Sequence, residues 1–170
     1  MKNVLWSFLF AFALWGCLKT DNPGSQQCSY PDSNIIAPDS QAAKVKAYLD
    51  SNGIVAQKDP TGFYYVIDSL GTGASVSNLC SVIQVKYKAM LTNGHVFDST
   101  AVNPVSFELG RVIPGWQKGI PKVRGGSKLA LYIPPALAYG PDDVKDNFGN
   151  VIIPGNSILV FHIEVLNISG

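Results

Sequence analysis

The sequence predicts a domain of the α+β class, with several antiparallel strands around one short helix. Segments that alternate apolar and polar residues recur along the chain, and such alternation is typical of strands with one buried face. Short turn sequences connect these segments, without the regular alternation of strands and long helices that parallel sheets require. The short helix is indicated by Pro114 and Gly115, because proline is tolerated in the first helical turn.

Length and composition favour one folded domain with appendages. The chain has 170 residues, and 46% of them are hydrophobic, which is ample for a core. Basic and acidic residues are nearly balanced, at 13 and 12. A balanced charge gives no reason to expect nucleic acid as a partner.

The first sixteen residues resemble a targeting segment. Lys2 precedes an uncharged apolar run over residues 4–15, which is too short to span a bilayer. The run ends at Gly16-Cys17, which resembles a bacterial lipoprotein cleavage site. We therefore predict a signal peptide over residues 1–16, lipidation of Cys17 and a lipid-anchored location in the cell envelope, on the periplasmic or outer-membrane side. An uncleaved anchor and a plain secretory signal are the alternatives.

The cysteine count agrees with this prediction. An exported chain with three cysteines leaves one thiol unpaired, and lipidation of Cys17 would account for it. Cys28 and Cys80 would then form a disulfide between the amino-terminal segment and the strand that begins near Cys80. Two free buried thiols are the alternative.

Two regions lie between the predicted signal peptide and the main domain. Residues 17–37 are polar and rich in turn formers, so they predict a flexible tether. Residues 38–58 predict a helix and a linker, with Asp39 or Ser40 as N-cap and Gly53 at the carboxyl end. The apolar stripe of this helix comprises Ala42, Val45 and Leu49.

Residues 59–170 predict the main domain. A β-favouring run covers residues 63–67, and an alternating strand covers residues 83–89. Asn93-Gly94 is a strong hairpin signal, because both residues tolerate positive φ. A last alternating strand covers residues 157–166.

The sequence offers little for metal or nucleophilic chemistry. Residues 141–151 are acidic and lack the spacing of an EF-hand, so we predict an irregular solvated loop. His95 and His162 lie outside any cysteine or carboxylate cluster with ligand spacing. No metal or cofactor is expected.

Several motifs together resemble the FKBP-type peptidyl-prolyl isomerases. They occur in the family's order, as VKY at 85–87, NGHVFDS at 93–99, VIPGW at 112–116, IPPALAYG at 133–140, IP at 153–154 and LVF at 159–161. The resemblance covers about residues 61–167. It implies a curved antiparallel sheet wrapped around the short helix, and isomerisation of Xaa–Pro bonds.

The resemblance also implies a set of site residues. The catalytic set would be Tyr87, Phe97, Asp98, Ile113, Trp116, Tyr139 and Phe161, and substrate would also contact Phe107, Val112 and Ile153. Trp116 would form the floor under the prolyl ring, although by residue type alone it could be ordinary core. The Ile113 N–H and the Tyr139 hydroxyl would bind ligand carbonyls. Asp98 would either approach the rotating carbonyl or accept a hydrogen bond from Tyr87 or nearby backbone.

The implied partners are proline-containing polypeptides, with the protein acting as a monomer that helps exported proteins to fold. A macrolide inhibitor could bind the same pocket. The pocket rim departs from the common family pattern, since no arginine lies between Asp98 and Val105 and Val105 replaces a usual phenylalanine. The alternative function is therefore an envelope-anchored chaperone or peptide-binding module that uses the pocket with little catalysis.

Overall fold

The computed structural model describes residues 28–100 and 102–170. The predicted signal peptide, residues 1–16, and the predicted lipidation site, Cys17, lie outside these residues. Among the helices of the described ranges, none is both long and apolar enough to cross a membrane.

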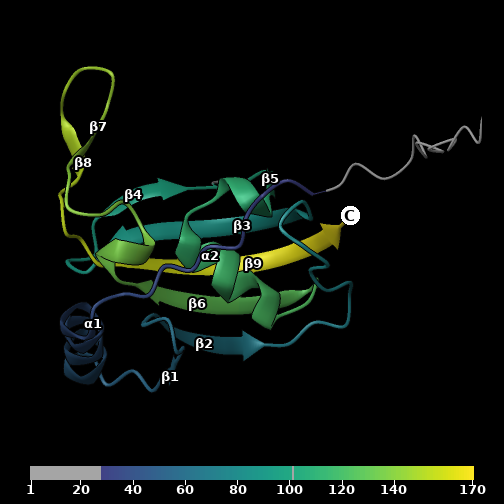
Figure 1. The fold of residues 1–170 in the computed structure, drawn as a ribbon, viewed down its shortest axis with the longest axis horizontal. Coiled ribbons are helices and arrows are strands. Elements are labelled where there is room, and N and C mark those ends of the chain that lie inside the picture. Colours follow the sequence, from purple (N-terminus) through teal and green to yellow (C-terminus); the bar gives the residue numbers. More distant parts are fainter. Residues whose placement is uncertain (1–27, 101) are drawn as a thin grey trace, which may run out of the picture.

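A seven-stranded antiparallel sheet forms the centre of the described residues (Figure 1). Its spatial order is β1 (Gln57–Lys58), β2 (Tyr64–Ser69), β6 (Ser127–Ile133), β9 (Leu159–Ser169), β3 (Val82–Leu91) and β4 (Val96–Ser99), while β5 (Val105–Glu108) also pairs with β3. Few helices accompany this sheet, and the predicted α+β class is confirmed. The predicted linker contributes β1, which pairs with β2 at one edge.

The central strands follow the expected alternation. In β3, Ile83, Val85 and Ala89 are buried, because their side chains point to the same face of the sheet. The register of β3 and β9 sets Tyr87 opposite Ile163 and Ala89 opposite Phe161. Residues that lie opposite each other in a sheet share a face, so Tyr87 and Phe161 both point toward the main core.

Helix α2 (Pro114–Gly119) covers the face of the sheet to which Tyr87 and Phe161 point, called the inner face below. Proline at its first position supplies a φ suited to a helix and needs no N–H there. Gly115 and Gly119 allow a close approach to β6, since an added Cβ would lie 2.6 Å from Ile133 and 2.8 Å from Leu131. Trp116, between the two glycines, is thereby held against the sheet and is 3% exposed.

Helix α1 (Asp39–Ser51) packs on the opposite face, at one end of the sheet (Figure 1). Its predicted stripe is buried, and Val45 and Leu49 join a second core cluster. The sheet residues of that cluster are Tyr64, Ala130, Tyr132 and Val160. The predicted N-cap at Asp39 or Ser40 is wrong: the cap is Pro38, whose side chain makes no capping bond, and Asp39 is already helical. The helix ends as expected before Gly53, which has φ +66°.

A hairpin replaces the predicted irregular loop over residues 141–151. Strands β7 (Val144–Lys145) and β8 (Val151–Ile153) pair, and Figure 1 shows the hairpin projecting from the body of the domain. Asp146 organises its turn, because its carboxylate accepts bonds from the N–H groups of Phe148 and Asn150, both at 2.9 Å. Acidic residues in this segment therefore build a turn as well as interacting with solvent.

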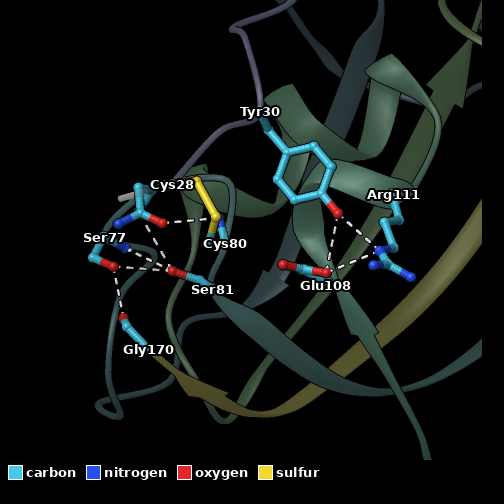
Figure 2. Close-up of a disulfide and its surroundings, with 9 residues drawn as sticks. Cys28, Tyr30, Ser77, Cys80, Ser81, Glu108, Arg111 and Gly170 are labelled. Atoms are coloured by element: carbon cyan, nitrogen blue, oxygen red, sulfur yellow. Dashed lines mark hydrogen bonds and ion pairs between the residues drawn. A yellow bond between two sulfur atoms is a disulfide. The ribbon is translucent and has the colours of Figure 1, made fainter. Parts of the chain in front are cut away.

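Residues 28–37, which belong to the flexible tether predicted over residues 17–37, form an amino-terminal strap along the domain. Cys28 and Cys80 are joined in a disulfide, with their Cα atoms 5.6 Å apart (Figure 2). At the other end, Ala37 is 4% exposed and its N–H donates to the Thr61 carbonyl at 2.8 Å. The strap is thus attached to the domain at both ends.

A buried carboxylate joins the first hairpin to the segment after α2. Asp59, in the turn between β1 and β2, is 7% exposed and pairs with Lys122 at 2.7 Å. Its carboxylate also accepts bonds from the N–H and hydroxyl of Thr61. Burial raises the pKa of Asp59, but the hydrogen bonds from Lys122 and Thr61 together outweigh it and lower the pKa below its usual value.

We expect Asp59→Asn to lower the free energy of unfolding by about 1–3 kcal/mol at pH 7, because a largely buried ammonium loses its partner. A depressed folded-state pKa stabilises the protein fully above the unfolded pKa, near 3.8, and this gain is lost as pH falls through the folded pKa. Urea unfolding at pH 7 and pH 2.5 should therefore show a smaller difference at acid pH. The control, Asp50→Asn in the exposed pair with Lys46, should shift stability by less than about 0.5 kcal/mol. A pH-independent difference for Asp59→Asn would contradict the assignment.

Candidate active site

A cavity of about 280 Å³ opens between the sheet and α2. This volume lies just below the usual range for small-ligand pockets and suits a small ring better than a large cofactor. The lining comes from β3, β4, β5, β9, α2 and the segments before α2 and β7. Its residues are Tyr87, Phe97, Asp98, Phe107, Arg111, Val112, Ile113, Trp116, Tyr139 and Phe161.

Trp116 is surrounded edge-on by three other aromatic rings. Its ring centroid lies 5.4 Å from that of Tyr87, 5.4 Å from that of Phe161 and 6.1 Å from that of Phe107, with interplanar angles of 84–90°. Edge-to-face contacts are favourable because the positive edge of one ring meets the negative face of another. Trp116 therefore belongs to the core and also lines the cavity, within a frame of three aromatic rings.

Buried donors are usually paired, and the Trp116 indole N–H is an exception. Nε1 has no hydrogen-bond partner among the described residues. An unpaired buried donor costs free energy and is uncommon in a packed core. The aromatic rings around this indole thus bury its N–H without supplying a polar partner.

Tyr87 and Asp98 form the polar edge of the cavity. The Tyr87 hydroxyl donates to Asp98 Oδ2 at 2.5 Å, from β3 to the adjacent β4. Burial and then the bond to Asp98 raise the pKa of Tyr87 well above its usual value, so the hydroxyl stays protonated at neutral pH. Of the two expected roles for Asp98, the structure contains the hydrogen bond from Tyr87. The carboxylate nevertheless remains part of the lining.

The backbone before α2 is held by a side chain of the helix itself. Gln117 Nε2 donates to the carbonyls of Val112 at 2.8 Å and Gly110 at 3.3 Å. Ile113 has an extended conformation, with φ −59° and ψ 150°, and its N–H has no partner among the hydrogen bonds of the described ranges. This donor therefore remains available to a ligand at the cavity.

Tyr139 lies at the mouth of the cavity, where it is 48% exposed. Partial burial and then the negative charge of Asp98 raise the pKa of the Tyr139 hydroxyl. The hydroxyl is thus a donor throughout the neutral range. It has no partner among the hydrogen bonds within the described part of the chain, which leaves it available to a ligand carbonyl.

Comparison with known proteins now decides the family. The model for the family described as FKBP-type peptidyl-prolyl cis-trans isomerase matches residues 74–166, more than half of the chain. The chain belongs to this FKBP family. The matched range contains every residue that lines the cavity.

Two solved FKBP-type structures resemble this one. The crystal structure of FkpA from Escherichia coli is 34% identical, has a TM-score of 0.64 and is matched over 77% of this chain and 60% of that chain. A peptidyl-prolyl cis-trans isomerase from Pseudomonas syringae pv. tomato is 26% identical, has a TM-score of 0.65 and is matched over 79% and 98%. The implied FKBP architecture is thus confirmed.

The curated FKBP relatives are longer proteins. FkpA of Buchnera aphidicola subsp. Schizaphis graminum is 38% identical over 126 residues, which are 73% of this chain and 47% of the relative. FkpA of Escherichia coli K12 is 40% identical over 110 residues, which are 64% and 38%. The chain therefore spans about half or less of the length of these relatives.

The structure brings most of the implied FKBP site together. Nine of the ten implied site residues line the cavity. The tenth, Ile153, is 4% exposed at the end of β8, belongs to the main core and is outside the lining, so its contact with substrate stays a prediction. Within the described ranges, no cluster of histidine, cysteine or carboxylate side chains could hold a metal ion.

Arg111 also lines the cavity, although it is not among the site residues that the family resemblance implies. It closes the short 3-10 helix η1 (Leu109–Arg111), immediately before the matched VIPGW motif. The common family pattern places a rim arginine between Asp98 and Val105, and this chain has none there. Its position one residue before Val112 is the signal that could have identified it, since Val112 was already assigned to the pocket.

Proposed function

We propose that the chain is a peptidyl-prolyl cis-trans isomerase that acts on Xaa–Pro bonds of exported proteins in the cell envelope. The observation that carries this proposal is the cavity over Trp116 with its aromatic lining, which lies within the FKBP-matched part of the chain. Slow prolyl isomerisation can limit the folding of a polypeptide, so such an enzyme would assist folding.

The reaction needs no nucleophile, because no covalent bond is made or broken. Rotation about an Xaa–Pro bond is slow because amide resonance imposes a barrier of roughly 18–20 kcal/mol. Lowering that barrier by about 8 kcal/mol accelerates the rotation roughly a million-fold. An enzyme achieves this when it binds the twisted amide more tightly than either planar form.

An apolar cavity favours the twisted form. A planar amide is strongly polar because resonance separates charge between nitrogen and oxygen, and twisting removes much of that polarity. Moving the planar form out of water therefore costs more than moving the twisted form. Aromatic walls supplied by Tyr87, Phe97 and Phe161 would exclude water around the reacting bond.

A few polar groups would orient the polypeptide. The Ile113 N–H and the Tyr139 hydroxyl would donate to carbonyls on either side of the proline, and the prolyl ring would rest on Trp116. Asp98 would lie at the rim near the rotating carbonyl, fixed there by the bond from Tyr87. These contacts position the substrate, while the apolar walls supply the preference for the twisted amide.

Isomerisation is distinguished from simple binding by two assays on the same preparation. A protease-coupled assay with a proline peptide measures isomerisation, and light scattering measures protection of a proline-free protein from aggregation. The proposal expects clear acceleration of isomerisation in the first assay. Protection of the proline-free protein without acceleration would instead favour the chaperone or binding-module alternative.

An envelope location is supported by the predicted leader, by Cys17 and by the Cys28–Cys80 disulfide, because disulfides persist in oxidising compartments. Cys17 would carry the lipid and hold the FKBP domain at a membrane surface. Two lipid signals anchor a protein far more stably than one acyl chain, so a diacylated cysteine would suffice.

Intact mass of the membrane-extracted chain tests the anchor. We expect a mass that begins at Cys17 and carries lipid, with residues 1–16 removed. Cys17→Ser should abolish the added mass, because the acceptor thiol is lost, and the protein should leave the membrane fraction. An unmodified Cys17, or an uncut leader, would rule the lipoprotein assignment out.

A further inference from the structure

Arg111 presents a cation at the mouth of the cavity. It lines the cavity, and its side chain is 74% exposed. Its Nε atom lies 2.9 Å from Glu108 Oε2 and donates to the Tyr30 hydroxyl at 2.8 Å. Among the hydrogen bonds of residues 28–100 and 102–170, none uses its two terminal amino groups. The guanidinium is therefore held at one atom while four of its five N–H donors remain available.

Tyr30 of the strap is the residue that holds this guanidinium. Figure 2 shows its hydroxyl between Arg111 and Glu108, where it also donates to Glu108 Oε2 at 3.1 Å. The Tyr30 ring packs directly over Gly110, because an added Cβ there would lie 2.7 Å or less from three ring atoms. The ring of Tyr30 thus packs on η1 and its hydroxyl binds Arg111, the last residue of η1, immediately before the lining residue Val112.

The strap that carries Tyr30 has its own anchor two residues away. The Cys28–Cys80 disulfide joins the strap to the loop before β3 (Figure 2). That loop is bonded to η1, since the Gly110 N–H donates to the Leu79 carbonyl at 2.6 Å and the Leu109 N–H to the Ser81 carbonyl at 3.0 Å. The strap, the loop before β3 and η1 are therefore linked to one another next to Arg111.

We propose that Arg111 is a further substrate-binding residue, and that Tyr30 is a positioning residue that acts through it. This inference rests on the proposed isomerase function. The ligand group is a main-chain carbonyl of the bound polypeptide other than the two assigned to Ile113 and Tyr139. An extended polypeptide presents further unpaired carbonyls, and the free guanidinium N–H groups can bind only hydrogen-bond acceptors. Fixing Nε in advance removes part of the rotamer entropy that a flexible arginine would lose on binding.

A double-mutant cycle tests the proposal, with KM and kcat measured for an uncharged N-acetylated proline peptide. Arg111→Met keeps the apolar stem and removes the donors, so KM should rise about fivefold with kcat nearly unchanged. Tyr30→Phe keeps the ring over Gly110 and removes the hydroxyl, so KM should rise about threefold. The double variant should match Arg111→Met alone, because Tyr30 would have no guanidinium left to position.

Lys118→Met is the matched control. Lys118 Nζ donates to the Ser33 carbonyl, so this change removes another strap contact without touching Arg111. It should leave KM unchanged, and thermal unfolding of all variants would show that each is folded. The inference is overturned if Arg111→Met leaves KM unchanged, if the double variant shows the product of both effects, or if Lys118→Met raises KM equally.

Failure of the proposed function has a different signature. In that case the unsubstituted chain would not accelerate isomerisation of the peptide, independently of the results for the variants. Calorimetric titration with the same peptide then still reports on Arg111. A dissociation constant raised about fivefold by Arg111→Met would support the carbonyl contact, and an unchanged constant would overturn it.

Discussion

Replacing Trp116 with leucine should reduce kcat/KM for a proline peptide by about 100-fold. Leucine removes roughly 100 Å² of aromatic surface from the cavity floor, and at about 25 cal/mol per Å² this is worth about 2.5 kcal/mol of binding to the twisted amide. A loss of that size corresponds to nearly two decades in rate. The three edge-on contacts with Tyr87, Phe107 and Phe161 would be lost as well.

Trp116→Phe separates the catalytic effect from a folding defect. Phenylalanine restores a flat aromatic surface in the frame, so it should recover much of the lost activity. Circular dichroism and thermal unfolding would establish that both variants are folded, which matters because Trp116 is 3% exposed. Full activity in a folded Trp116→Leu protein would exclude this indole as the floor of the site.

Replacing Leu49 with alanine should lower the free energy of unfolding by about 3 kcal/mol. Leu49 is 1% exposed between α1 and the outer face of the sheet, so truncation leaves a cavity that the neighbouring Tyr64, Tyr132 and Val160 cannot fully close. Alternate residues of the same strands face the main core on the other side of the sheet, and among them Phe161 lines the active-site cavity. The change should therefore leave kcat/KM unaffected at temperatures where the variant is folded.

Chemical denaturation and the peptide assay measure these two effects on one preparation. Val55→Ala is the matched control, because it removes apolar atoms from a side chain that is 92% exposed. It should change stability by less than about 0.5 kcal/mol. A Leu49→Ala protein of normal stability would mean that the packing of α1 contributes little to the stability of the fold. A reduced kcat/KM in the folded state would mean that the packing of α1 affects the active-site cavity.

Burial on one face made the strands predictable. In most of β3 and β9 the apolar residues recur at every second position. One face of these strands packs on the main core, and the other meets solvent and, in part, the second core cluster. The turn at Asn93-Gly94 was predictable for a local reason, since Gly94 has φ +85°. The start of α1 was not predicted correctly. Asp39 and Ser40 are residue types that can cap a helix, but the position before the helix is taken by Pro38.

Long-range contacts account for what the sequence could not predict at the site. The aromatic lining was found through short motifs, whose residues are recognisable one by one. Tyr30 and Arg111 are 81 positions apart and belong to no common motif, so only the fold shows that their side chains meet. The β7–β8 hairpin, which lies outside the site, was missed for a local reason. The side-chain bonds of Asp146 organise its turn, and an acidic composition does not reveal them.

Exchange spectroscopy of a neutral Xaa–Pro peptide, with and without the chain, tests the central claim most directly. NMR would follow cis–trans exchange in the peptide and the resonance of the Trp116 indole N–H in the same tube. We predict exchange far above the spontaneous rate together with a shift of that indole resonance as the peptide fills the cavity. Exchange at the spontaneous rate despite a shifted indole would contradict catalysis by this cavity and leave only binding.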